Sequence, residues 1–248
     1  MSFEITEPSA AARLARLTGT LYLMFILASV FADTLGHVGL GDSSQIYGSI
    51  TTSLGSFRGA LVLAFASAFF FLMAAWGLYV LLRTVNAEMA LLFLLLNAAG
   101  VAVQCASLLW LISAMLQGDP SSGLSGVSVA QAHSSTLVSI DTYRIGFVTA
   151  QLFYGTWLFP LGFLVLKSEL LPRFLGVLLI LDGVGELVWF LQGLLLPDRH
   201  AITYPGTAVS LVAEVALALW LLVRGVRVGE STSRSASARP DVGHPTPR

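Results

Sequence analysis

The chain has 248 residues, and its 13 Lys and Arg and 14 Asp and Glu side chains make up only 11% of the sequence. Soluble domains carry about 25% charged residues, so the composition excludes an ordinary cytosolic enzyme. Only 16 of these charges fall between residues 17 and 223, and the mean hydropathy is +0.81. The net charge is −1, and no basic run alternates with aromatic residues, which excludes a nucleic-acid-binding surface. The middle of the chain is therefore expected to lie in lipid.

Six apolar stretches are each long enough to cross a membrane, because about 20 apolar residues at roughly 1.5 Å each span the hydrocarbon core. We predict an all-α, polytopic bundle of six transmembrane helices over residues 16–35, 58–82, 89–116, 145–166, 173–196 and 202–223. Residues 1–15 form an N-terminal segment and residues 16–223 form the membrane domain. Residues 224–248 are polar and rich in Ser and Pro, which predicts a disordered tail.

Basic residues are distributed unevenly between the two sides of the predicted bundle. If the N-terminus is cytoplasmic, the outer segments hold only Arg58, Arg144 and Arg199, and the other ten basic residues lie inside. Cytoplasmic loops carry the excess of Lys and Arg in membrane proteins, so both termini are expected in the cytoplasm. The longest outer loop, 117–143, is expected to contain a short helix on the membrane surface.

Carboxyl groups occur within the predicted spans. Asp182 and Glu186 are four residues apart and share one face of the fifth span, and Glu214 falls near the middle of the sixth. A carboxyl at this depth must be protonated or paired, and no Lys or Arg lies well inside a span. We therefore regard Asp182, Glu186 and Glu214 as candidate catalytic acids or proton-binding groups.

Polar and aromatic side chains of the other spans gather toward the outer side. The candidate ligand-binding residues are Asp33, Gln104, Trp110, Gln151, Tyr154, Trp157 and Trp189. Hydrogen bonds that only hold helices together are the alternative role for the amides. No His spacing is typical of a metal site, no motif indicates a cofactor, and the lone Cys105 excludes an internal disulfide.

Residues 153–188 read FYGTWLFPLGFLVLKSELLPRFLGVLLILDGVGELV, and residues 12–19 read ARLARLTG. Over about residues 10–220 the chain resembles the bacterial membrane family known as domain of unknown function 4386. The resemblance rests mainly on Lys167 to Leu179. It implies six helices in a bacterial inner membrane and carries no established activity.

Three functions remain open from the sequence. The first is an enzyme or binder of a lipid or isoprenoid-like molecule in an outward cavity, with Asp182 or Glu186 as general acid. The second is a proton-coupled transporter in which Glu214 and Asp182 bind protons, and its six spans would have to form a homodimer. The third is a structural or regulatory subunit whose polar residues only join helices. The expected partners are membrane lipid and a hydrophobic small molecule.

Overall fold

The computed structural model describes residues 8–119 and 128–226, and this part of the chain is helical without any strand. Six helices are long and apolar enough to cross a membrane, which confirms the predicted fold class. They are α1 (Pro8–Gly36), α3 (Leu54–Leu82), α4 (Ala87–Gly118), α5 (Val129–Lys167), α6 (Arg173–Leu195) and α7 (Tyr204–Val223). A shorter helix, α2 (Ser43–Thr52), and a 3₁₀ turn (His200–Ile202) complete the described elements.

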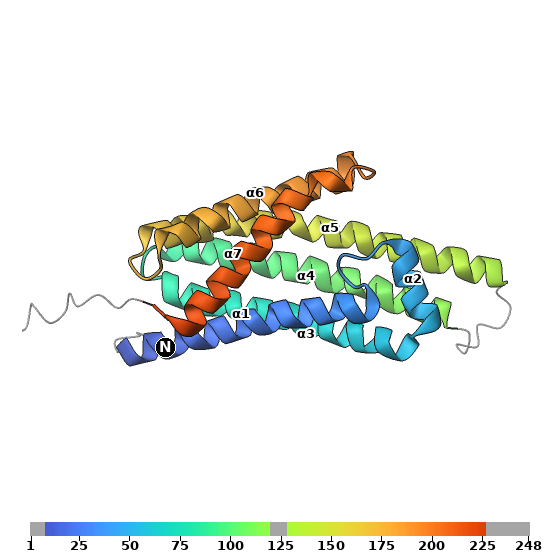
Figure 1. Cartoon of the computed structure of the whole chain (residues 1–248), viewed down its shortest axis with the longest axis horizontal. Coiled ribbons are helices and arrows are strands. Elements are labelled where there is room, and N and C mark those ends of the chain that lie inside the picture. Colours follow the sequence, from blue (N-terminus) through green and yellow to red (C-terminus); the bar gives the residue numbers. More distant parts are fainter. Residues whose placement is uncertain (1–7, 120–127, 227–248) are drawn as a thin grey trace, which may run out of the picture.

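The long helices form one elongated bundle (Figure 1). Helix α1 packs on α3 and α7, while α5 packs on α4 and α6, and α6 packs on α7. Helix α7 crosses the bundle obliquely, so that it lies beside α6 at its beginning and beside the first half of α1 at its end (Figure 1). This oblique course separates the second half of α1 from α6.

The two ends of the bundle differ in charge. The first residues of α1 and the last residues of α7 lie at the same end as the α3–α4 and α5–α6 turns (Figure 1). We name it the basic end, because its described residues include Arg13, Arg16, Arg83, Lys167, Arg173 and Arg224. The half of the bundle away from the basic end carries Arg58, Arg144 and Arg199. The uneven distribution of basic residues expected from the sequence thus holds between the two halves of the described bundle.

The region between the third and fourth spans differs from the expectation. Residues 129–143 form the first turns of α5, which continues to Lys167, so the described part of this loop contains no separate surface helix. Ser128 begins the helix by accepting a hydrogen bond from the N–H of Gln131 at 3.2 Å. Ile140 and Tyr143 are buried, so this part of α5 packs against the bundle. The tail expected to be disordered lies outside the described residues from 227 onward.

Helix α2 was not predicted, although its N-terminal signal is present in the sequence. Asp42 accepts from the N–H of Gln45 at 2.8 Å, and the Gln45 side chain accepts from the N–H of Asp42 at 2.9 Å. This reciprocal pair satisfies two donors that a helix start leaves free. Hydrogen bonds from Ser44 and from the Gln45 backbone lower the pKa of the Asp42 carboxyl. Ile46 and Ile50 are buried, so α2 covers the opposite end of the bundle.

Two reciprocal glycine contacts bring α5 and α6 together. Gly155 lies against Gly183, and Gly162 lies against Gly176. A Cβ atom added at Gly183 would lie 2.8 Å from the carbonyl oxygen of Gly155, and one added at Gly162 would lie 2.9 Å from that of Gly176. Small residues let membrane helices approach until their backbones touch. The helix that carries Asp182 and Glu186 is therefore fixed against α5 by backbone contact.

We expect Gly183→Ala to lower the free energy of unfolding by about 1–3 kcal/mol, because the added methyl group forces the two backbones apart. The measurement is thermal unfolding of the purified protein in detergent. Gly59→Ala on α3 is the matched control, because a Cβ atom there meets nothing within 4 Å. Equal unfolding temperatures for the two variants would show that the α5–α6 contact is looser than described.

Candidate functional site

A cavity of about 440 Å³ lies among the six long helices. Its wall includes the loop residues Val38, Gly39 and Leu40, so the cavity lies in the half of the bundle away from the basic end. Seven aromatic residues contribute to the wall: Phe25, Phe71, Tyr143, Phe147, Tyr154, Trp157 and Trp189. Pockets for small molecules usually have volumes of about 300–1,000 Å³ and mostly apolar walls. The size and the wall therefore suit a small hydrophobic molecule.

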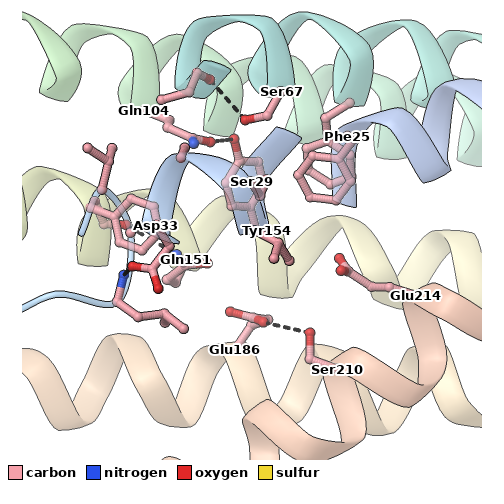
Figure 2. Close-up of a pocket in the computed structure, with 18 of the residues that line it drawn as sticks. Phe25, Ser29, Asp33, Ser67, Gln104, Gln151, Tyr154, Glu186, Ser210 and Glu214 are labelled. Carbon is pink, nitrogen blue, oxygen red and sulfur yellow. Dashed lines mark hydrogen bonds between the residues drawn. The ribbon is translucent and has the colours of Figure 1, made fainter. Parts of the chain in front are cut away.

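The three candidate carboxyls meet at this cavity. Asp182 and Glu186 come from α6 and Glu214 comes from α7. Figure 2 shows Glu186 and Glu214 extending toward the same space from these two helices. Glu186 Oε1 accepts a hydrogen bond from Ser210 at 3.2 Å, and Glu214 Oε1 accepts one from the Tyr22 hydroxyl at 3.4 Å. Helices that are neighbours in space thus supply acids to one site.

Asp182 is the most enclosed of these acids. Its side chain is fully buried at 0% exposure, and neither carboxyl oxygen has a hydrogen-bond partner among the described residues. Ser210 also stands near Asp182, but its single hydroxyl proton is directed to Glu186. The second oxygen of Glu186 likewise has no partner in the described part of the chain. Buried polar groups without partners are rare and call for an explanation beyond packing.

The described part of the cavity wall is acidic and has no basic residue. Among the described residues that line it, none is Lys, Arg or His. Arg58 forms an ion pair with Asp119 at 3.7 Å, at the end of the bundle away from the basic end. Neither residue lines the cavity. No set of three His, Cys, Asp or Glu side chains in residues 8–119 and 128–226 is placed to hold a metal ion. The acids therefore have neither a cationic side chain nor the grouping of a metal site around them.

The two glutamines have hydrogen-bond partners within the bundle. The Tyr154 hydroxyl on α5 donates to Gln104 Oε1 on α4 at 2.5 Å, which joins these helices beside the cavity (Figure 2). Gln151 Nε2 donates to the carbonyl of Phe147 at 3.4 Å. The Gln104 bond joins two helices, as the alternative role expected, whereas the Gln151 bond lies within α5. All three residues, Gln104, Gln151 and Tyr154, also line the cavity.

The tryptophans expected at the site lie in two different places. Trp157 is buried and meets Phe71 edge to face with the ring centroids 5.3 Å apart, and Trp189 meets Phe147 at 5.8 Å. Both line the cavity. Trp110 does not line it, and its side chain is 47% exposed. The inward face of α4 carries Leu108 and Leu111, which turns Trp110 to the outside of the bundle.

Asp33 lines the cavity and also holds the loop between α1 and α2 in place. Its Oδ1 accepts a hydrogen bond from the backbone N–H of Leu40 at 3.1 Å. The chain turns sharply here, with positive φ at His37 (56°) and Gly39 (132°). His37 Nδ1 lies 2.9 Å from the Ser49 hydroxyl on α2. The loop between α1 and α2 is therefore held by hydrogen bonds to both helices where it forms part of the cavity wall.

Sequence reasoning missed part of the aromatic wall. Phe25 precedes Ser29 by four residues on α1, and Phe71 follows Ser67 by four residues on α3. Each phenyl ring thus continues the face of a polar residue by one turn. Extending those polar faces along each helix would have found both residues.

Part of the cavity wall is exposed on the surface of the bundle. Val30 and Leu40 belong to its wall, yet they are 54% and 66% exposed, and Thr34 between them is exposed as well. Helix α1 packs mainly on α3 and α7, and α6 packs mainly on α5 and α7. We name the surface formed by Val30, Thr34 and Leu40 the lateral mouth. Two of its three residues are apolar; Val30 and Thr34 lie in the second half of α1, and Leu40 lies in the loop that follows this helix.

Residues 17–225 match the sequence profile of a family described as Domain of unknown function (DUF4386). The chain belongs to this family. An "Uncharacterized protein" of Archaeoglobus fulgidus is 32% identical to the DUF4386 chain over 87 residues, which cover 33% of this chain and 48% of that protein. The chain thus aligns with about half the length of this relative. No solved structure matches. The function must therefore be argued from the site itself.

We expect Asp33→Ala to release the Leu40 N–H and to loosen the loop over the cavity. Loss of one hydrogen bond of about 1 kcal/mol should raise the hydrogen-exchange rate at Leu40 roughly fivefold. Exchange measured by mass spectrometry on the detergent-purified protein provides the test. Asp198→Ala, in the exposed segment before α7, is the control and should leave residues 38–41 unchanged. An unchanged hydrogen-exchange rate at Leu40 in Asp33→Ala would show that Asp33 does not hold the loop in place.

Proposed function

We propose that this DUF4386 protein binds a lipid or isoprenoid-like molecule in the cavity between its helices. The observation that carries the proposal is the enclosed aromatic wall around a fully buried Asp182 whose oxygens have no partner in the described residues. A purely structural subunit gains nothing from such a group, because the helices would pack more stably around an apolar residue. Binding of a ligand explains both the space and the acid.

The lateral mouth supports entry of the molecule from the bilayer. Val30 and Leu40 are apolar and exposed on the side of the bundle while they line the cavity. We further infer that the basic end faces the cytoplasm of a bacterial inner membrane, with both chain termini on that side. In this orientation the cavity belongs to the outer half of the membrane, and its ligand comes from the outer leaflet.

The acids also allow a chemical step on the bound molecule. Asp182 or Glu186 would serve as general acid toward a double bond or a leaving group, since both acids line the cavity. Positive charge that develops in the ligand would be stabilised by the faces of Trp157, Trp189 and Tyr154. Ser210 would keep Glu186 oriented through its hydrogen bond.

A bulky residue in the cavity should block binding. We expect Ser29→Phe to weaken binding of geraniol, a small isoprenoid alcohol, by about tenfold or more, because the added ring occupies the space among Phe25, Phe71 and Tyr154. Binding is measured by quenching of tryptophan fluorescence in nanodiscs of phosphatidylcholine. Trp157 and Trp189 line the cavity, so their fluorescence is sensitive to a ligand bound there.

Ala102→Phe is the matched control, because Ala102 lies exposed on α4 and the same ring would point away from the bundle. This variant should bind geraniol as the unmodified protein does. The proposal fails if the unmodified protein gives no saturable quenching. In that event the structural-subunit alternative gains support, provided that Asp182→Asn and Glu186→Gln change only thermal stability.

A proton-coupled transporter is the second candidate function. The observation that favours it is that Asp182 and Glu214 line one cavity from two different helices, so that relative movement of α6 and α7 would change the surroundings of both acids. The Tyr22 hydroxyl extends the polar contacts of Glu214 to α1. A transport path through six spans would require a homodimer, which we propose only together with this function.

For the transporter we expect geraniol binding to change the number of protons bound to the protein, because coupling between two ligands is reciprocal. Proton release or uptake is measured in weakly buffered detergent solution as geraniol is added. Asp182→Asn should abolish the proton change, whereas Glu169→Gln, in the exposed turn before α6, should keep it. Saturable binding without any proton change would contradict the transporter and leave the binder.

A further inference from the structure

We propose that the ligand of this cavity is a lipophilic amine that binds as its ammonium ion, with a hydrophobic body and one positively charged nitrogen. The inference rests on the proposed binding function and specifies the charge of the ligand. It depends on three features of the wall: its one-sided charge, its unpartnered acid oxygens and its aromatic rings.

The charge of the wall selects against anions. Four carboxyl groups line the cavity, from Asp33, Asp182, Glu186 and Glu214, and the described lining residues include no cation. A fatty acid or a phosphate ester would find no positively charged partner among these residues, so its burial would leave a negative charge unpaired. A positively charged ligand instead supplies the opposite charge that a buried carboxylate requires.

The unpartnered oxygens require hydrogen-bond donors. Both oxygens of Asp182, which is 0% exposed, and Oε2 of Glu186 have no partner within the described residues. A carboxylate accepts hydrogen bonds only, and an ammonium group is a donor only, with as many as three protons for a primary amine. Bonds between charged donors and acceptors are about twice as strong as neutral ones. A hydroxyl group would offer a single proton and no charge.

The aromatic wall suits both parts of such a molecule. Phe71 stands edge to face with Tyr154 and with Trp157, at centroid distances of 5.2 and 5.3 Å, and all three rings line the cavity. Ring faces attract ammonium groups as well as hydrocarbon, and the attraction grows when water is excluded.

An inorganic cation fits the arrangement less well. No three acids, histidines or cysteines in the described chain are grouped closely enough to hold a metal ion. Calcium takes about six to eight oxygen ligands, and magnesium takes six. A cavity of about 440 Å³ is also far larger than one ion. The spacing of the acids and the volume together favour an organic cation.

Three probes with one carbon skeleton test the charge preference: geranylamine, geraniol and geranic acid. Each is titrated at pH 7 into the full chain in phosphatidylcholine nanodiscs, so that no anionic lipid attracts the amine. We expect the amine to bind at least about tenfold more tightly than the alcohol, and the acid to bind most weakly. Quenching of tryptophan fluorescence measures all three affinities.

Substitutions that keep the shape of each acid but remove its charge identify the groups responsible for the preference for the amine. Asp182→Asn and Glu214→Gln should each reduce the advantage of the amine over the alcohol, with little change for geraniol itself. Glu169→Gln, outside the cavity, should leave the advantage intact. Circular dichroism and size-exclusion chromatography check the fold of each variant. If one of the variants misfolds, Glu186→Gln on the same face of α6 as Asp182 provides a further test of the amine preference.

The outcomes separate the two proposals. Equal affinity for geranylamine and geraniol would overturn the ammonium inference while saturable binding of geraniol would preserve the proposed function. An amine preference that persists in all three acid variants would also overturn the inference, because it would then arise from the lipid or from another surface. Absence of saturable binding for every probe would remove both proposals.

Discussion

The site depends on backbone contact between three consecutive helices. Gly183 lets α6 touch α5 at Gly155, and Gly185 lets α6 touch α7, where an added Cβ atom would lie 2.8 Å from the Cα of Gly206. These glycines lie between Asp182 and Glu186. Helix α6 therefore uses residues without side chains to approach its neighbours and uses the residues beside them to place acids in the cavity. Wider spacing of the helices would leave the carboxyls facing lipid, where no partner exists.

The glutamines and the acids of the cavity wall differ in their hydrogen bonds. Gln104 and Gln151 have hydrogen-bond partners within the protein, which offset the cost of their burial. The Gln104 bond joins α4 to α5, and the Gln151 bond lies within α5. Asp182 has no such partner in the described residues although it is completely buried. Helix packing explains the glutamines and leaves Asp182 unexplained. An acid without a partner in the wall of a cavity is the reason to seek a ligand here.

The sequence predicts the spans well where lipid alone determines them. Residues 58–82 and 173–196 were expected to be helical, and the helices run over Leu54–Leu82 and Arg173–Leu195. Prediction fails where protein contacts replace lipid. Helix α2 is too short and polar to resemble a span, but it is stabilised by its cap and by burial of Ile46 and Ile50. The first turns of α5 are also polar. They are stabilised by packing against other helices, as the buried Ile140 and Tyr143 show, and not by contact with lipid.

The acids were identifiable from the sequence because charge in an apolar run is conspicuous, whereas aromatic residues in such a run are not. Trp110 and Trp157 look alike in the sequence, yet one is 47% exposed and the other is buried in the wall. Only the rotation of each helix in the bundle separates them. A membrane helix has apolar residues on all sides, so its inward face is marked by polar residues and glycines rather than by hydrophobicity.

The lateral mouth and the acids place opposite demands on a ligand, and an amine meets both. Val30 and Leu40 form an apolar entrance, through which a fixed charge would pass only at the cost of several kcal/mol of lost hydration. An uncharged amine carries no such cost and becomes an ammonium ion when it takes a proton at the carboxyls. The ion pair then forms inside the cavity without net charge having crossed the entrance. A permanently charged ammonium compound lacks this route, so the depth of the acids behind an apolar mouth favours ligands whose charge is acquired on arrival.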